Sequence, residues 1–310
     1  MRNENQNRLT WFAIPYVGWM TLFVVAPILM VVIYAFSAEG GGFTLDSFAR
    51  MGTYTLVFAR SFKLAIIATV ICVLIGYPVA YFMAKEGPKF QKAAMLLIML
   101  PMWMNFLLRT YAWMSILDNN GLLNQIFAAT GVIGLGNTLN GWLNGVCADL
   151  NAILGLALNT ARATDMKSFR MLYTQEAVVL GMVYNYLPFM ILPIYSVILK
   201  LDNSLLEAAR DLGANSIRVF QKVILPLSLP GVLSGITMVF VPSVSTFAIS
   251  KMLGGGTQMM LGDLIEMQFL GGAYNPHLGS AISLVMMIIV VACMWVMNRF
   301  GEGEEQAVML

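Results

Sequence analysis

The chain has 310 residues, of which 59% are hydrophobic and 11% charged, whereas a soluble domain usually carries about 25% charged residues. This composition argues against a soluble globular protein and indicates the membrane class, with lipid as the expected surroundings. The net charge of +2 is too small to indicate nucleic acid or another anionic partner.

Residues suited to metal binding or covalent catalysis are few and scattered. His277 is the only histidine, and Cys72, Cys147 and Cys293 lie far apart in the sequence. We therefore expect no histidine-based metal centre, no catalytic dyad and no disulfide framework.

Six apolar runs are long enough to cross a bilayer, which takes roughly 20 helical residues. Lipid offers no hydrogen bonds to the backbone, so these runs are expected to be helices. They are residues 11–37, 61–84, 93–117, 175–199, 231–250 and 279–298. The sequence thus predicts an all-α integral membrane protein of about six transmembrane helices.

The predicted organisation has three parts. Residues 1–60 form an N-terminal tail, the first transmembrane helix and an outer loop; residues 61–298 form the transmembrane domain, and residues 299–310 a cytoplasmic tail. The first run, residues 11–37, is too long for the apolar region of a secretory signal, so we expect it to be retained. Lysine and arginine are denser in the segments that lie inside if both termini are cytoplasmic, which favours that orientation.

A long segment, residues 118–174, is expected to be an outer loop. It contains a glycine- and asparagine-rich stretch, residues 131–145, and residues 150–161 have the pattern of a short amphipathic helix. Such a loop is compatible with docking of an extracellular partner, and equally with a lid or an insertion.

The cytoplasmic loop, residues 200–230, carries the clearest local signals. Ser204 followed by Glu207 has the spacing of a capping box, which predicts that a helix starts at Ser204. Gly213 suits the left-handed position that ends a helix. Asn215 or Ser216 is then expected to cap a second helix, which Pro226 ends. These signals predict a rigid element.

The same residues resemble a known motif. Glu207, Ala208, Ala209, Gly213 and the run 223–226 ending in Pro226 are similar to the EAA loop of bacterial ABC importer permeases, with Val223 in place of isoleucine. The resemblance implies a type I (MetI-like) permease bundle in the bacterial cytoplasmic membrane, with an EAA coupling loop. It also implies that Ser204, Glu207, Ala208, Ala209, Gly213 and Pro226 form the element that docks on an ATPase.

Partners and cofactors follow from this resemblance. It implies a second permease subunit, two ATPase subunits and an extracellular or periplasmic solute-binding protein. The chain has no glycine-rich phosphate loop followed by lysine, since residues 40–42 and 254–256 lack that lysine. ATP and Mg²⁺ are therefore expected on the partner ATPase, and this chain is expected to bind no cofactor and to be no enzyme.

A second resemblance concerns the solute. Residues 108–113, 120–124, 184–195 and 201–214 are similar to spermidine/putrescine importer permeases of the B type. The similarity runs from about residue 61 to 298, but residues 131–172 are longer than the family's loop. It implies import of polyamines, which carry two to four positive charges.

Candidate pathway residues are acids and aromatic rings near the spans, because both favour a cation. Asp263 and Glu266 are three residues apart, so a helix would place them on one face. The candidates are Trp113, Asp118, Tyr184, Asp263, Glu266 and Phe269. For each acid a helix cap or interfacial charge is the favoured alternative, and for each ring an interface anchor. Arg109 is expected to reach the interface or to pair with Asp118.

Three rival functions stay open from the sequence. One is the same type of importer for another solute, such as an organophosphonate or an oxyanion, although the acids at Asp263 and Glu266 disfavour anions. Another is an ion channel, but the sequence shows no filter-like loop. A membrane enzyme is the third, disfavoured because no catalytic cluster is evident.

Overall fold

The computed structural model describes residues 15–38, 40–154 and 163–308. The chain divides into two compact units, each of which is described by itself. The terminal unit comprises Met1–Lys63 and Met260–Leu310, and the central unit comprises Leu64–Met259. Residues 11–14 of the first predicted span and 155–161 of the predicted amphipathic helix lie outside the described residues.

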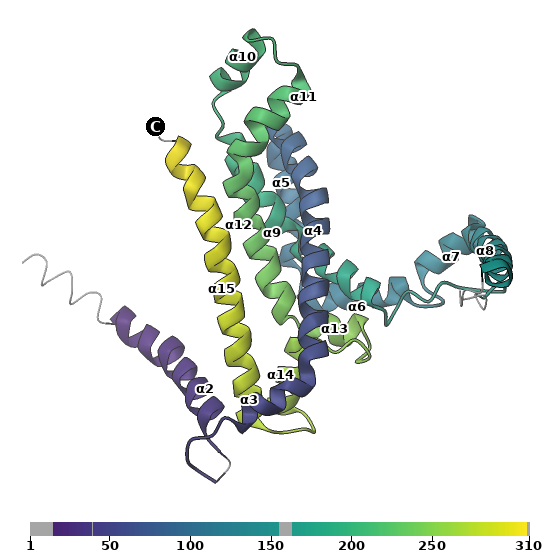
Figure 1. The fold of residues 1–310 in the computed structure, drawn as a ribbon. Helices are drawn as coiled ribbons and strands as arrows, with labels where there is room; N and C mark the ends of the chain where they lie inside the picture. The colour runs from purple at the N-terminus through teal and green to yellow at the C-terminus, as the bar shows by residue number, and fades with distance from the viewer. Residues whose placement is uncertain (1–14, 39, 155–162, 309–310) are drawn as a thin grey trace, which may run out of the picture. The chain divides into compact units, whose positions relative to one another are not determined.

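Five helices in the described part of the chain are long and apolar enough to cross a membrane, and one bent helix pair is a sixth candidate. The five are Pro15–Phe36, Asp46–Lys85, Gln175–Leu199, Ser216–Ser245 and Pro276–Met297, and the pair is Pro88–Trp103 with Phe106–Ala129. The predicted all-α class with about six spans is confirmed (Figure 1).

In the terminal unit, the long helix α15 (Pro276–Val308) packs against α2 (Ala26–Phe36) and α14 (Leu261–Leu270). A π turn, Thr21–Val25, precedes α2, and the short helix α3 (Asp46–Met51) also contacts α15. Small residues make the first contact possible, because Ala35 and Ala281 are fully buried there.

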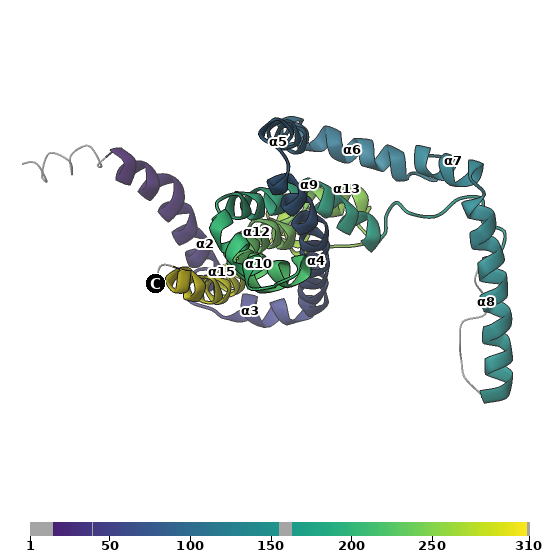
Figure 2. The same cartoon turned by 90° about the horizontal axis from the view of Figure 1, so that it is seen from above.

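The core of the central unit is the pair α9 (Gln175–Leu199) and α12 (Leu225–Ser245). α4 (Thr55–Lys85) packs against both, with Gly76 next to Met190 and Tyr77 next to Ser228. A Cβ atom at Gly231 would lie 3.0 Å from the carbonyl oxygen of Pro193, and one at Gly235 would lie 2.7 Å from the Met190 sulfur. The two glycines therefore let the backbones of α9 and α12 approach closely. Seen from above, α4, α9 and α12 lie side by side (Figure 2).

The prediction that residues 93–117 form a single helix is wrong. α5 (Pro88–Trp103) ends at Trp103. The stretch Phe106–Ala129, which begins with α6 (Phe106–Leu117), is bent by 92° relative to α5. Asn105 is extended, and its side chain accepts a hydrogen bond from the Leu107 N–H at 2.8 Å. The apolar run hid this cap, because hydropathy averages over one polar residue.

The fifth predicted span, residues 231–250, is also corrected. The helix begins 15 residues earlier, since Ser216–Ser245 is continuous, and it ends where Thr246 adopts an extended conformation. A separate short helix, α13 (Ala248–Leu253), follows. The fourth predicted span, Gln175–Leu199, has the predicted bounds.

The predicted outer loop contains much more helix than its composition suggested. α7 (Leu122–Ala129) is followed by the 23-residue helix α8 (Val132–Leu154), which covers almost all of the glycine- and asparagine-rich stretch. Asparagine side chains stabilise it through contacts made far along the chain, which local propensity does not reveal.

Candidate functional site

The coupling segment comprises α10 (Asn203–Asp211), α11 (Ser216–Val219) and the π turn η3 (Phe220–Ile224). Asp202 is the N-cap of α10, and its carboxylate accepts a hydrogen bond from the Ser204 N–H at 2.9 Å. The predicted capping box starting at Ser204 is therefore wrong. Aspartate caps as well as serine does, and its negative charge also favours a helix N-terminus. Hydrogen bonds from Ser204 lower the pKa of Asp202 below its ordinary value.

The end of α10 confirms the role predicted for Gly213. Its φ is +80°, in the left-handed region. The Gly213 N–H donates to the carbonyl of Arg210 at 2.8 Å, and the Ala214 N–H donates to that of Ala209 at 3.1 Å. These two bonds are the Schellman arrangement, which satisfies the last carbonyls of a helix.

The second helix starts as predicted but does not stop at Pro226. Asn215 caps α11, since its side chain accepts from the Arg218 N–H at 2.9 Å. The helix then passes through η3 into α12, with Pro226 in the first turn of α12. The Leu225 N–H donates to the carbonyl of Phe220, five residues back. This wider turn accommodates the proline, whose ring would crowd a regular helix.

The surface of the coupling segment combines small and apolar side chains. Glu207 and Ala208 are exposed, and so are Leu205, Leu212 and Ile217, of which Leu212 is 89% exposed. Single exposed apolar residues are ordinary, whereas this short segment carries three of them.

Sequence reasoning missed an aromatic contact that links η3 to α4. The Phe220 ring lies edge-on to Tyr77 at 5.8 Å and to Tyr81 at 5.2 Å between centroids. The Tyr77 hydroxyl is 2.8 Å from that of Ser228, and the Lys85 ammonium lies 4.1 Å from the centre of the Tyr81 ring. The tyrosines are four residues apart, a spacing that places them on one helix face.

Two of the predicted pathway rings are brought together. Trp113 of α6 and Tyr184 of α9 are in edge-to-face contact, with centroids 5.3 Å apart. They come from helices separated in sequence by residues 118–174.

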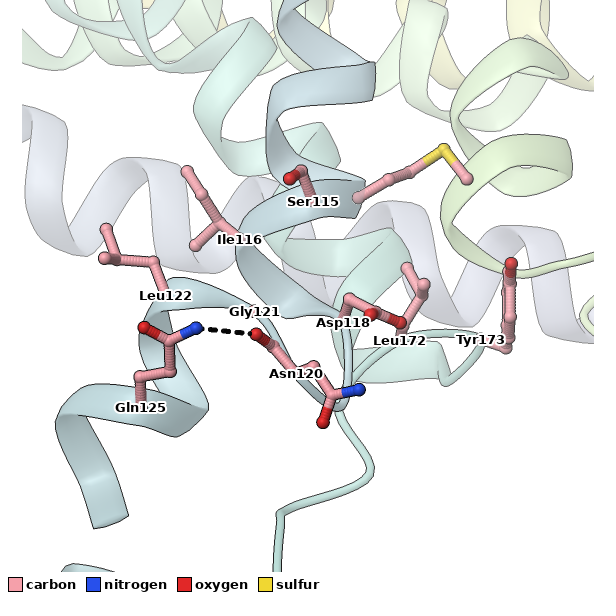
Figure 3. Close-up of a pocket in the computed structure, with 10 residues that line it drawn as sticks. Ser115, Ile116, Asp118, Asn120, Gly121, Leu122, Gln125, Leu172 and Tyr173 are labelled. Carbon is pink, nitrogen blue, oxygen red and sulfur yellow. Dashed lines mark hydrogen bonds between the residues drawn. The ribbon is translucent and has the colours of Figure 1, made fainter. Parts of the chain in front are cut away.

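Asp118 lines a cavity of about 490 Å³ at the end of α6 (Figure 3). The polar side chains of Asn120 and Gln125 lie around it, and the Gln125 amide donates to the Asn120 carbonyl at 3.0 Å. Within the described residues, Nε and Nη1 of Arg109 are buried without a hydrogen-bond partner. The predicted pairing with Asp118 is thus not formed through those atoms.

The remaining candidates, Asp263, Glu266 and Phe269, lie on α14, as the predicted helix requires. The Asp263 carboxylate accepts from the Met260 N–H at 2.9 Å, so it caps the helix that carries it. The Phe269 ring packs closely on α15, because a Cβ atom at Gly279 would lie 2.9 Å from it. Asp263 and Phe269 therefore have structural roles, and the part of all three residues in a pathway stays a prediction.

Long apolar helices, one of them broken, and a capped, partly apolar segment between α9 and α12 are typical of a membrane transport subunit. The model of one family, the binding-protein-dependent transport system inner membrane component, matches residues 76–302. The chain belongs to this family.

Curated relatives agree with the family. The chain is 35% identical over 293 residues to the "Spermidine/putrescine transport system permease protein PotB" of Haemophilus influenzae, covering 92% of this chain and 91% of that protein. It is 34% identical over 282 residues to the protein of the same name in Escherichia coli, covering 88% and 90%.

Solved structures support the fold. A bacterial ABC transporter that imports alginate has a chain with a TM-score of 0.70 at 14% identity, covering 97% of both chains. The MetNI methionine ABC transporter gives a TM-score of 0.52 at 15% identity, covering 82% of this chain and 97% of the other. The protein is thus a multi-pass inner membrane protein and the non-catalytic permease component of an ABC importer, a complex that includes a binding protein and ATPases.

Proposed function

We propose that this permease serves an importer of polyamines, spermidine or putrescine. The observation that carries the proposal is the 34–35% identity, over about nine tenths of the chain, to permeases named for these two solutes. A negative-inside membrane potential favours inward movement of a cation by about 2.3 kcal/mol per charge per 100 mV. The permease therefore needs only to replace water around the amine groups.

The pathway residues are proposed on chemical grounds. Trp113 and Tyr184 present a pair of rings in contact, and a ring face attracts an ammonium group by about 0.5–2 kcal/mol. Asp118 supplies a carboxylate at an open cavity. Asp263, Glu266 and Phe269 are proposed as a second group on α14.

Uptake by the reconstituted complex tests the solute. Radiolabelled putrescine is offered with unlabelled spermidine, putrescine, phosphate or an organophosphonate as competitor. We expect both amines to compete and neither anion to do so. Competition by an anion, with none from either amine, would favour the rival importer of anionic solutes.

We also propose that the coupling segment docks on the ATPase subunit that binds ATP and Mg²⁺. The residues involved are those of the motif, namely Ser204, Glu207, Ala208, Ala209, Gly213 and Pro226. Support comes from the stiffness of the two capped helices and from the exposed Leu212 and Ile217. This arrangement puts the segment and both termini in the cytoplasm. A second permease subunit completes the membrane part.

Docking is tested by placing a bulky side chain on the exposed surface. Ala208→Trp is expected to abolish co-purification of the ATPase while membrane insertion stays normal, because Ala208 is exposed and makes no core contact. Thr130→Trp, on an exposed residue of the outer segment, is the matched control. Undiminished co-purification with Ala208→Trp, and with residues 208–213 deleted, would refute the docking proposal.

A further inference from the structure

The helix α8, in the outer segment, has three distinct faces. One face carries Asn137 and Asn140, a second carries exposed small residues, and a third carries large apolar side chains. The apolar face is formed by Val132, Leu135, Leu139 and Trp142, with exposed fractions of 37%, 70%, 56% and 63%. Their spacing of three and four residues keeps them in one stripe along the helix.

The asparagine face is covered by the chain itself. Asn137 exchanges two hydrogen bonds with the backbone of Met166, both 3.0 Å long, and Asn140 donates to the carbonyl of Ala163 at 2.9 Å. Asn124 of α7 holds Phe169 in the same way, at 2.8 and 3.0 Å. The segment 163–169 is thus fixed along one side of α8.

Most charged residues of this region lie on the returning chain. Asp149 is the only charged residue of α8, whereas Asp165, Lys167 and Arg170 follow one another closely in the returning chain. At about 100° per residue, the asparagine face is turned roughly 150° from the apolar stripe. The covering segment, which carries Asp165 and Lys167, therefore lies on the side of α8 away from the stripe, whereas Asp149 lies beyond the C-terminal end of the stripe.

We propose that α8 lies in the outer surface of the bilayer, with Val132, Leu135, Leu139 and Trp142 inserted among the lipids. Three observations favour lipid as the occupant. The stripe from Val132 to Trp142 carries no charge, and tryptophan prefers the membrane interface. The covering segment 163–169 is held on another face of α8 by the asparagines, as polar groups are in interfacial helices.

The direction of α8 within the central unit also fits lipid as the occupant of the stripe. It runs across the direction of α12, since it is seen end-on where α12 is seen from the side (Figures 1 and 2). Exposed apolar residues of α7, Leu122 and Ile126, continue the surface from the bent span toward α8. The stripe is therefore continuous in sequence with a segment that already belongs to the membrane.

Spin labels along α8 test this proposal. The assembled transporter is reconstituted in lipid nanodiscs, in a background where Cys72, Cys147 and Cys293 are replaced by serine or alanine. A nitroxide is then attached to a single cysteine at 132, 135, 139 or 142, and at the exposed control positions Gly134, Thr138 and Gly145. ATP hydrolysis by each labelled complex confirms that it is folded and assembled.

We expect collisions with oxygen to dominate along the stripe and collisions with a water-soluble nickel chelate to dominate at the controls. The ratio should oscillate with the helical period of 3.6 residues. High accessibility to the nickel chelate along the stripe would mean that it faces water and would overturn the proposal. Low accessibility to both reagents would show that a protein covers the stripe, and would overturn it too. The measurement uses no solute, so its outcome is independent of the polyamine proposal.

Discussion

At the C-terminus of α10, the chain turns through Gly213, whose φ of +80° is strained for residues with a Cβ atom. No atom lies within 4 Å of a Cβ built there, so a substitution would act through the backbone alone. The left-handed conformation costs most residues about 1–2 kcal/mol, and asparagine less.

Gly213→Val is therefore expected to weaken ATPase association, whereas Gly213→Asn retains most of it. Association is measured by titrating the permease complex with labelled ATPase. Gly87→Ala is the control, since Gly87 has a φ of −68° and no atom within 4 Å of its added Cβ. Equal loss with valine and asparagine would show that the turn does not depend on backbone strain.

At the other end of α10, Asp202→Ala is expected to loosen the coupling segment, because the Ser204 N–H loses its acceptor. Asp202→Asn keeps the acceptor and should lose less. Hydrogen–deuterium exchange of residues 203–211 measures the difference. Since the pKa of Asp202 is lowered, its contribution is complete above the ordinary value of an aspartate and is lost as pH falls through the lowered one. Exchange in Asp202→Asn should therefore be less dependent on acid pH than in the unmodified protein.

Among the helices, η3 contacts α4 through aromatic rings, and we propose that motion of the coupling segment reaches the bundle through this contact. Two edge-to-face pairs, Phe220 with Tyr77 and with Tyr81, are worth about 0.5–1.5 kcal/mol each. Phe220→Ala is expected to lower solute transported per ATP by about tenfold, the equivalent of about 1.4 kcal/mol, while ATP hydrolysis continues. Phe90→Ala, at an exposed position of α5, is the control. An unchanged ratio of transport to hydrolysis would remove Phe220 from the coupling path.

The close approach of α9 and α12 makes a second prediction for the helices. Gly231→Val should lower thermal stability, because its side chain would meet the backbone of Pro193 and Ile194, 3.0 and 3.1 Å from the Cβ, and overpacking costs about 1–3 kcal/mol. Gly134→Val has open space around its Cβ and serves as the control. The melting temperatures of the two variants are measured in detergent by intrinsic fluorescence and compared. Equal melting temperatures would contradict this account of the packing.

The helices also show what the sequence could predict. Hydropathy predicted the spans because lipid forces an apolar run into a helix, and Gln175–Leu199 has the predicted bounds. A break in a helix depends on a single capping residue such as Asn105, which an average of hydropathy over many residues does not reveal. Helix α8 is held by hydrogen bonds between Asn137 and Met166, 29 residues further along the chain. In the site, Gly213 could be predicted because its backbone conformation is local. The contact of Phe220 with α4 could not, because it joins residues more than a hundred positions apart.

For the whole molecule, the side of the membrane on which Leu212 lies tells how the chain is oriented. The side chain of Leu212 is 89% exposed, so Leu212→Cys in a cysteine-free permease, expressed without the ATPase that is proposed to cover this surface, should react fully with a soluble maleimide. We expect labelling in inside-out vesicles and none in right-side-out cells. Thr130→Cys, in the outer segment, should behave in the opposite way. Reaction of Leu212→Cys from outside the cell would reverse the topology and exclude docking on a cytoplasmic ATPase.

The π turn η3 has a consequence for how α11 and α12 face their surroundings. Ile217 and Ile224 are seven residues apart, which on a regular helix is nearly the same face, yet Ile217 is 65% exposed and Ile224 only 4%. The extra residue of the wide turn shifts the helical phase, so a helical wheel drawn across residues 216–245 assigns the wrong side to one half. Deleting one residue within 220–224 would restore the regular phase and rotate the docking surface by about 100°. Motion of the ATPase would then no longer reach the permease, although the ATPase itself could still hydrolyse ATP.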